Sequence, residues 1–345
     1  MEPIRLGALT LYPFGLILAG LLVLFFAFTA WQMKKHGLKA ETASWFVVLA
    51  VPLCFVLARL FYCLMIADVI IGESDYGKFF RFGEGGFLLW GAIAGLLLAA
   101  GITGKITGQS GAKIADTVVF PAFLMIAAIR LVCGLVITEF GIGAPLETWF
   151  SPEETDFTCR FSVWALEDWS FFERFPFAVM NYYDTWCWAI FSLQTLWAAA
   201  AAFMVRGIRA AEGGKAVWFV VLHACGAIVT ECMLIGGEIL YLPWQGFVKA
   251  NEIISAAALI VVLAVCLRRL PKGQRLKSGL LAAVQFLCAI GIIIAMEFAA
   301  FEKKLSDIAW LPADACHLLV ILACLWIALA FRPVWKKAYP APDKA

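Results

Sequence analysis

The sequence predicts an all-α membrane protein, a polytopic bundle of about nine transmembrane helices with its N-terminus outside and its C-terminus in the cytoplasm. Its composition, its long apolar runs and the distribution of its positive charge support this prediction. Hydrophobic residues make up 63% of the 345 residues, charged residues make up 15%, and the mean hydropathy is +0.89. Soluble domains are about half apolar and about a quarter charged, so this composition is typical of an integral membrane protein.

The apolar runs are each long enough to cross a bilayer, which takes about 17–25 residues. Because hydrocarbon offers no hydrogen-bond partners, each run should satisfy its own backbone as a helix. The runs cover residues 10–33, 44–67, 86–104, 114–140, 184–205, 216–241, 250–267, 279–297 and 316–331. Lys34, Lys35 and Lys39 follow the first run, where a signal peptide would have a small-residue cleavage site. We therefore expect the first run to be an uncleaved span.

The segments between the runs predict the orientation. With the N-terminus outside, the inner segments contain 17 Lys and Arg residues and the outer segments contain eight. Positive residues collect in cytoplasmic loops, and an odd number of spans places the termini on opposite sides. The longest outer segment, about residues 141–183, is acidic and aromatic. This composition suits either a small cap at the membrane interface or a solvated loop.

The charge and the cysteines argue against several classes of function. The formal net charge is only +2 and Lys and Arg form no stripe, so no nucleic-acid-binding surface is expected. The 11 cysteines include no C-x-x-C pair, so neither a zinc site nor a redox pair is indicated. We expect no metal and no cofactor.

Three ionisable residues inside the apolar runs are the first candidates for function: Arg59, Arg130 and Glu231. Charged side chains within spans are costly and usually face a cavity or a partner. At a rise of about 1.5 Å per residue, all three lie at a similar depth in the outer half of the bilayer. Two buried guanidinium groups suit an anionic phosphate. A structural Arg130–Glu231 pair is the alternative.

The third apolar run opens with the glycine-rich segment FGEGGFLLWGAIAG, residues 82–95. Glu84 lies at its outer edge, and Gly91 and Gly95 follow at a spacing of four residues. Small residues allow helices to approach closely. The segment therefore predicts either a helix-packing seam or room for a ligand beside Glu84.

In this order, these residues resemble the prolipoprotein diacylglyceryl transferase family over about residues 10–266. The likeness is carried by LYPFGLILAG, LARLFYCLM, GEGGFLLWGAIAG, DTVVFPAFLMIAAIRLVCGLVITEFGIG, IVTECMLIGG and FVKANEIIS. The positions that match the family's motifs are Arg59, Glu84, Gly91, Arg130, Gly141, Glu231 and Ser255. The chain departs from the motifs at Trp90, in place of a histidine, at Cys133, in place of an asparagine, and at Ala227, in place of an arginine.

The resemblance implies an activity, a set of site residues and a domain division. Family members move a diacylglyceryl group from phosphatidylglycerol to the cysteine thiol of a lipoprotein precursor, at the outer half of the bacterial plasma membrane. The implied catalytic residues are Arg130, Glu231 and Glu84, and the implied lipid and phosphate contacts are Arg59, Arg130, Trp90, Gly91 and Gly141. A transferase-like core of seven helices is expected over residues 1–270, with a two-helix extension and cytoplasmic tail over 271–345.

Two other functions remain open. A non-catalytic relative would bind lipid or a lipoprotein precursor without transferring anything. A small-solute or lipid transporter often shows paired broken helices in two halves, and the sequence has no such internal symmetry.

Overall fold

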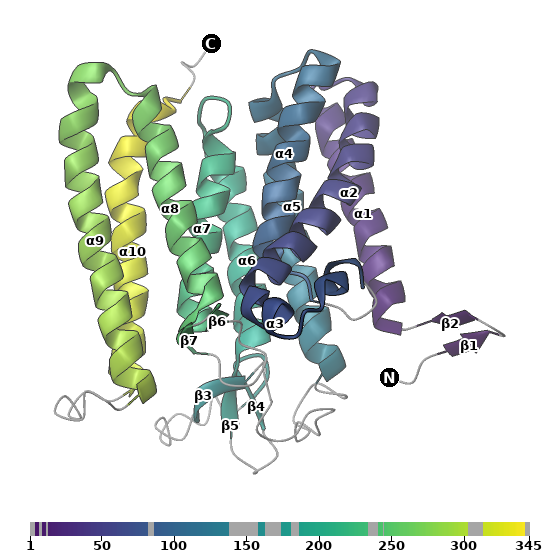
Figure 1. The fold of residues 1–345 in the computed structure, drawn as a ribbon. Coiled ribbons are helices and arrows are strands. Elements are labelled where there is room, and N and C mark those ends of the chain that lie inside the picture. The colour runs from purple at the N-terminus through teal and green to yellow at the C-terminus, as the bar shows by residue number, and fades with distance from the viewer. Residues whose placement is uncertain are drawn as a thin grey trace.

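The fold is a bundle of long helices that stand side by side, seen in a computed structural model (Figure 1). The structure describes residues 4–6, 9–11, 13–81, 86–137, 158–162, 174–180, 186–233, 241–243, 245–302 and 313–341. Within these ranges, nine helices are long and apolar enough to cross a membrane. The predicted fold class, a polytopic helical membrane bundle, is therefore confirmed.

The long helices alternate in direction along the chain. They are α1 (Pro13–Lys35), α2 (Ala40–Met65), α4 (Leu89–Thr107), α5 (Gly111–Ile137), α6 (Ile190–Gly207), α7 (Gly214–Glu231), α8 (Ala250–Arg269), α9 (Lys272–Glu302) and α10 (Ala313–Ala338). Helices α1, α4, α6, α8 and α10 each carry Lys or Arg in the last turn. These last turns gather at one end of the bundle, which we call the basic end and which also holds the C-terminus (Figure 1).

The opposite end of the bundle holds the short strands, and we call it the strand end (Figure 1). An antiparallel pair joins β1 (Ile4–Leu6) to β2 (Leu9–Leu11), and another joins β6 (Tyr241–Leu242) to β7 (Gln245–Lys249). A three-stranded sheet has the order β3–β5–β4, from Thr158–Ser162, Trp186–Ala189 and Ala178–Met180. Parts of the expected outer segment 141–183 thus form strands, and its remaining residues lie outside the described ranges.

Two predicted spans are clearly shorter as helices than the apolar runs that predicted them. The run predicted over 184–205 starts as β5, and α6 begins only at Ile190. The run predicted over 216–241 ends as a helix at Glu231. Gly236 and Gly237 follow in the sequence, and glycine has a low helix propensity. Glu231 is therefore the last residue of its helix, where the apolar run had placed it well inside a span.

Close helix packing fixes the centre of the bundle. Helix α5 packs against α1, α4, α6 and α7. Helix α4 lies against α2, and a Cβ atom added to Gly91 would come within 2.2 Å of the Leu57 carbonyl oxygen. One added to Gly95 would come within 2.6 Å of the Cys54 Cα atom. Glycine at these two positions is what allows the backbones of α2 and α4 to touch.

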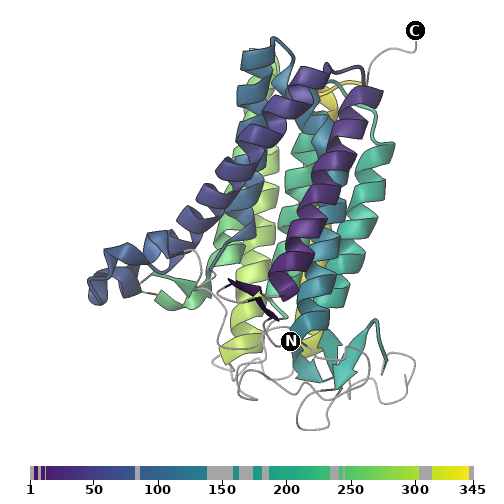
Figure 2. The same cartoon turned by 90° about the vertical axis from the view of Figure 1, so that its right-hand side faces the viewer.

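A short arm projects sideways from the bundle at the strand end of α2 (Figure 2). It consists of helix α3 (Ala67–Gly72) and the 3-10 helix η1 (Tyr76–Phe80). The arm exposes the large apolar side chains of Val69, Ile71, Tyr76 and Phe80. Exposed apolar and aromatic side chains beside a transmembrane bundle suit the membrane interface.

Candidate functional site

Polar side chains gather inside the bundle near its strand end, where α4 and α8 begin and where α5 and α7 finish. We call this group the central polar cluster. Its members are Trp90, Arg130, His223, Glu231, Lys249, Asn251, Glu252 and Ser255. They come from α4, α5, α7, β7 and α8, so the fold brings together residues as far apart in sequence as Trp90 and Ser255.

Arg130 and Glu231 are the charged pair at the centre of the cluster. The guanidinium of Arg130, on α5, interacts electrostatically with the carboxylate of Glu231, the last residue of α7. Glu231 is buried, and its Oε1 atom accepts a hydrogen bond from the Asn251 side-chain amide at 3.2 Å. The imidazole of His223, two turns before Glu231 on α7, also feels the charge of Arg130. The structure thus assembles an arginine, a carboxylate and a histidine from two neighbouring helices.

Lys249 is a second cation in the cluster, and the sequence reasoning missed it. Its side chain is only 2% exposed, and its ammonium donates to the Glu231 carbonyl oxygen at 2.7 Å. It also lies 4.0 Å from the carboxylate of Glu252, in the first turn of α8. A positive charge at the end of α7 and a negative charge at the start of α8 both complement the helix dipoles.

Trp90 closes the cluster on the side of α4. Its indole N–H donates to the Ser255 hydroxyl at 3.2 Å, and that hydroxyl donates to the Asn251 carbonyl oxygen at 2.6 Å. Its ring packs edge-on against His223, with the ring centroids 4.8 Å apart. Trp90 and Ser255 are both buried, so this chain of hydrogen bonds ties α4 to the first turn of α8.

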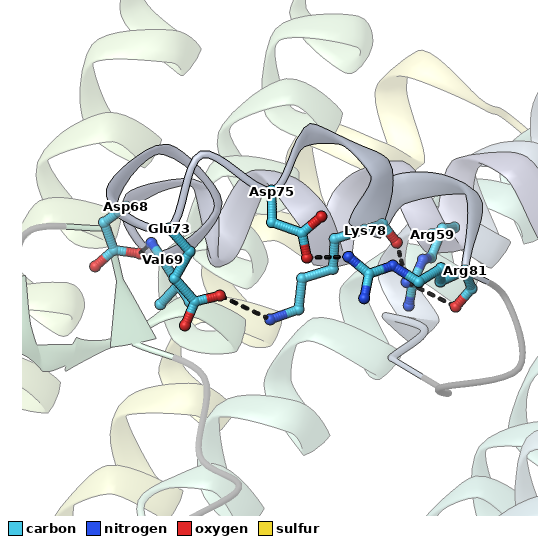
Figure 3. Close-up of polar contacts among 7 residues, drawn as sticks. All are labelled: Arg59, Asp68, Val69, Glu73, Asp75, Lys78 and Arg81. Atoms are coloured by element: carbon cyan, nitrogen blue, oxygen red, sulfur yellow. Dashed lines mark hydrogen bonds and ion pairs between the residues drawn. The ribbon is translucent and has the colours of Figure 1, made fainter.

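Arg59 lies apart from this network and holds the arm (Figure 3). The residue is 1% exposed, and its guanidinium donates to the backbone carbonyls of Lys78, Phe79, Arg81 and Gly86. The bonds to Phe79, Arg81 and Gly86 measure 3.3, 3.1 and 3.0 Å. These carbonyl oxygens occupy the guanidinium N–H groups that would otherwise bind a phosphate. The geometry therefore favours Arg59 as the anchor of the arm over Arg59 as a phosphate ligand.

Ion pairs within the arm add to this anchor. Arg81 pairs with Asp75, and the Lys78 ammonium lies 3.9 Å from the Glu73 carboxylate (Figure 3). Exposed pairs of this kind contribute little stability each. Among the residues that the structure describes, the buried guanidinium of Arg59 is therefore the polar anchor of the arm.

Sequence comparisons identify relatives of the chain. The family model of prolipoprotein diacylglyceryl transferase matches residues 3–268. The chain belongs to this family. The phosphatidylglycerol–prolipoprotein diacylglyceryl transferase of Geobacillus kaustophilus is 23% identical over 277 residues, which are 78% of this chain and 92% of that protein.

Two further relatives carry the same name. The protein of Lysinibacillus sphaericus is 22% identical over 268 residues, which are 77% of this chain and 90% of that protein. The protein of Oceanobacillus iheyensis is 29% identical over 126 residues. That match covers 36% of this chain and less than half of the relative, 43% of its length.

The diacylglyceryl transferase motifs can now be placed in the structure. Arg130, Glu231 and Trp90 meet in the central polar cluster, whereas Arg59 binds the backbone of the arm. Gly91 lies against the α2 backbone. Of the two roles expected for the glycine-rich segment, a helix-packing seam or room for a ligand, this contact supports the packing seam. Glu84 and Gly141 lie outside the described residues. The match ends inside α8, so α9 and α10 lie beyond the part that the family model covers.

Proposed function

We propose that this chain transfers a diacylglyceryl group from phosphatidylglycerol to the cysteine thiol of a lipoprotein precursor. The observation that carries the proposal is the electrostatic interaction between the Arg130 guanidinium on α5 and the buried Glu231 carboxylate on α7, both within the part of the chain that the family model matches. A cation and a carboxylate that interact supply the two functions that this transfer needs. One binds the departing phosphate, and the other removes the thiol proton.

The reaction balances with these two groups. Glu231 accepts the thiol proton, because the thiolate is the reactive form of cysteine. The sulfur then attacks the glyceryl carbon that carries the phosphate ester, so that a carbon–sulfur bond forms as the carbon–oxygen bond breaks. Arg130 stabilises the negative charge of the glycerol phosphate that leaves, in a site where fixed charges act strongly. The nucleophile belongs to the precursor, so none of the chain's own cysteines is consumed.

Lys249 and Asn251 support the proposed base. Lys249 fixes the end of α7 through the Glu231 carbonyl, and Asn251 orients the Glu231 carboxylate. Groups that hold a catalytic side chain within a narrow range of positions raise the rate by pre-organisation. We therefore assign positioning roles to both residues.

The test uses purified protein in phosphatidylglycerol vesicles with a peptide that contains one cysteine. Lipidation of the peptide is followed by its increase in mass. Glu231→Gln should lower the rate by about 10²–10⁴-fold, the usual contribution of a general base. Glu212→Gln is the matched control, because Glu212 is an exposed carboxylate at the basic end. Equal rates for these two variants would remove Glu231 from the mechanism.

Trp90 favours a second candidate function, binding without transfer. Its indole occupies the position of the family histidine and is engaged with Ser255. A chain that retained labelled phosphatidylglycerol or precursor peptide yet formed no lipidated peptide would have this function. Complementation of a bacterial strain depleted of its own transferase separates the two candidates in cells.

The proposed setting is the bacterial plasma membrane, with the strand end on the outer side. The excess of Lys and Arg at the basic end supports this orientation through the positive-inside bias. Phosphatidylglycerol and the precursor would then both reach the central polar cluster from the outer leaflet.

A further inference from the structure

A cavity lies at the basic end of the bundle, away from the central polar cluster. It has a volume of about 580 Å³ and is lined by α1, α5 and α6, with Lys215 from the first turn of α7. This volume lies within the range of about 300–1,000 Å³ that is usual for small-molecule sites. Nothing in the proposed transfer reaction uses it.

Three cations line this cavity: Lys35, Arg206 and Lys215. The Lys35 ammonium lies 5.2 Å from the centre of the Trp31 ring, and the Arg206 guanidinium lies 5.5 Å from that of Phe120. Among the residues that the structure describes, none of the three cations lies within 4.0 Å of a carboxylate. The cavity therefore presents positive charge that a ligand can neutralise.

The one carboxylate in the cavity wall is already engaged. Asp116 accepts hydrogen bonds from the backbone N–H groups of Gly213 and Ala216, both at 2.8 Å. It thereby caps the N-terminus of α7, where a negative charge is favourable. Its carboxylate also interacts electrostatically with the Lys215 ammonium. One negative charge thus faces three cations, and positive charge remains in excess in the cavity.

His36, at the edge of the cavity, reports the local excess of positive charge. Partial burial, together with the nearby ammonium groups of Lys215, Lys35 and Lys113, holds the pKa of His36 below its ordinary value. An anion in the cavity would oppose the contribution of the three ammonium groups.

The cavity also reaches the surface that faces the membrane. Trp31 and Phe203 both line it, and they are 53% and 61% exposed. Aromatic side chains at a helix end are typical of the membrane–water interface. A ligand here would thus contact cations at one end and apolar side chains at the other, which is the chemistry of an amphiphile.

We propose that this cavity binds the head group of an anionic phospholipid from the leaflet at the basic end. Arg206 and Lys215 hold the phosphate, and the Trp31 and Phe203 rings contact the glycerol and the start of the acyl chains. The site is separate from the transfer reaction, so the proposal stands whether or not the chain is catalytic. With the basic end inside, the leaflet is the cytoplasmic one.

The test places the protein in vesicles that contain phosphatidylglycerol with a photoreactive head group, and maps the labelled peptides. Label is expected on peptides that contain residues 28–36 and 203–206. The double variant Arg206→Gln/Lys215→Gln should lose at least tenfold of this label. Lys336→Gln/Lys337→Gln is the matched control, because it removes two exposed lysines from the same end of the bundle, and it should retain the label. Gel filtration and thermal unfolding confirm that both variants are folded.

Three results would overturn the proposal. A phosphatidylcholine analogue with the same photoreactive group would label these peptides equally if the cavity did not select negative charge. Inorganic phosphate would abolish the label if the site bound a free anion. Unchanged labelling of Arg206→Gln/Lys215→Gln would show that these cations do not hold the lipid.

Discussion

At the scale of single residues, Arg130 offers the sharpest test of the proposed site. Arg130→Lys keeps the charge that Glu231 feels but loses the planar fork that binds phosphate in two places. We expect near-normal thermal stability and weaker capture of phosphatidylglycerol. Arg130→Ala removes the cation that interacts with the buried Glu231 carboxylate, and breaking a buried charge pair typically costs about 3–5 kcal/mol. Bound phosphatidylglycerol and the melting temperature are measured for both variants. A lysine variant that binds lipid normally would indicate a structural pair only.

The interaction energy between Lys249 and Glu252, two members of the central polar cluster, can be measured by mutation. Lys249→Met removes a buried ammonium that lies 4.0 Å from the Glu252 carboxylate, so a loss of about 3–5 kcal/mol in the free energy of unfolding is expected. Adding Glu252→Gln should recover part of that loss, because the double variant buries no lone charge. Thermal unfolding is measured for Lys249→Met, for Glu252→Gln and for the double variant, which together form a double-mutant cycle. Strictly additive losses would mean that the two side chains do not interact.

At the scale of elements, the contact between α2 and α4 explains why the glycine-rich segment is glycine-rich. In Gly91→Ala the new methyl group meets the Leu57 carbonyl and the Ala58 Cα atom, which are backbone and cannot turn aside. Overpacking of this kind costs about 1–3 kcal/mol. Gly101→Ala lies on the same helix with no atom within 4 Å of the added Cβ, so it should be neutral or slightly stabilising. Equal melting temperatures for the two variants would contradict the packing role.

The arm is the element whose position depends most on one side chain. Arg59→Leu keeps a buried apolar stem but removes the hydrogen bonds to four backbone carbonyls, those of Lys78, Phe79, Arg81 and Gly86. We expect the arm to detach, so that limited proteolysis cuts within residues 66–81 at least several-fold faster. Arg209→Leu removes an exposed arginine just after α6, at the opposite end of the bundle, and serves as the control. Unchanged cleavage would show that the arm is held by its apolar contacts instead.

Elements were predicted more completely than the site, and the reasons are physical. A run of apolar residues specifies a membrane helix because the bilayer leaves the backbone no other partner. The same rule does not say where a helix stops inside an apolar run. For this reason the sequence predicts a span to residue 241, whereas α7 ends at Glu231. Lys249 was missed because it lies beside a span, where a lysine in sequence is indistinguishable from a solvated one. Only the pairing of β6 with β7 and the start of α8 turn it inward.

At the scale of the whole molecule, the two ends of the bundle have different proposed tasks. The strand end carries the central polar cluster and the arm, and the basic end carries the cavity lined by Lys35, Arg206 and Lys215. The family match ends at residue 268, yet α10 packs against α7, and Trp335 donates to the Gly214 carbonyl at 3.0 Å. Helix α10 is thus integrated into the basic end, and it also packs against α8.

The orientation of the bundle decides which leaflet each of the two proposed lipid sites faces. Residue 160 lies in β3 at the strand end, and residue 275 lies in the first turns of α9 at the basic end (Figure 1). Reporter fusions after these two residues should give an outer signal and a cytoplasmic signal, respectively. The physical reason is the excess of Lys and Arg at the basic end, since positive residues near span ends are retained in the cytoplasm. Signals from the same side would contradict the arrangement of the spans. Reversed signals would keep the bundle but move the central polar cluster to the cytoplasmic leaflet, where a precursor exported across the membrane would no longer meet Glu231.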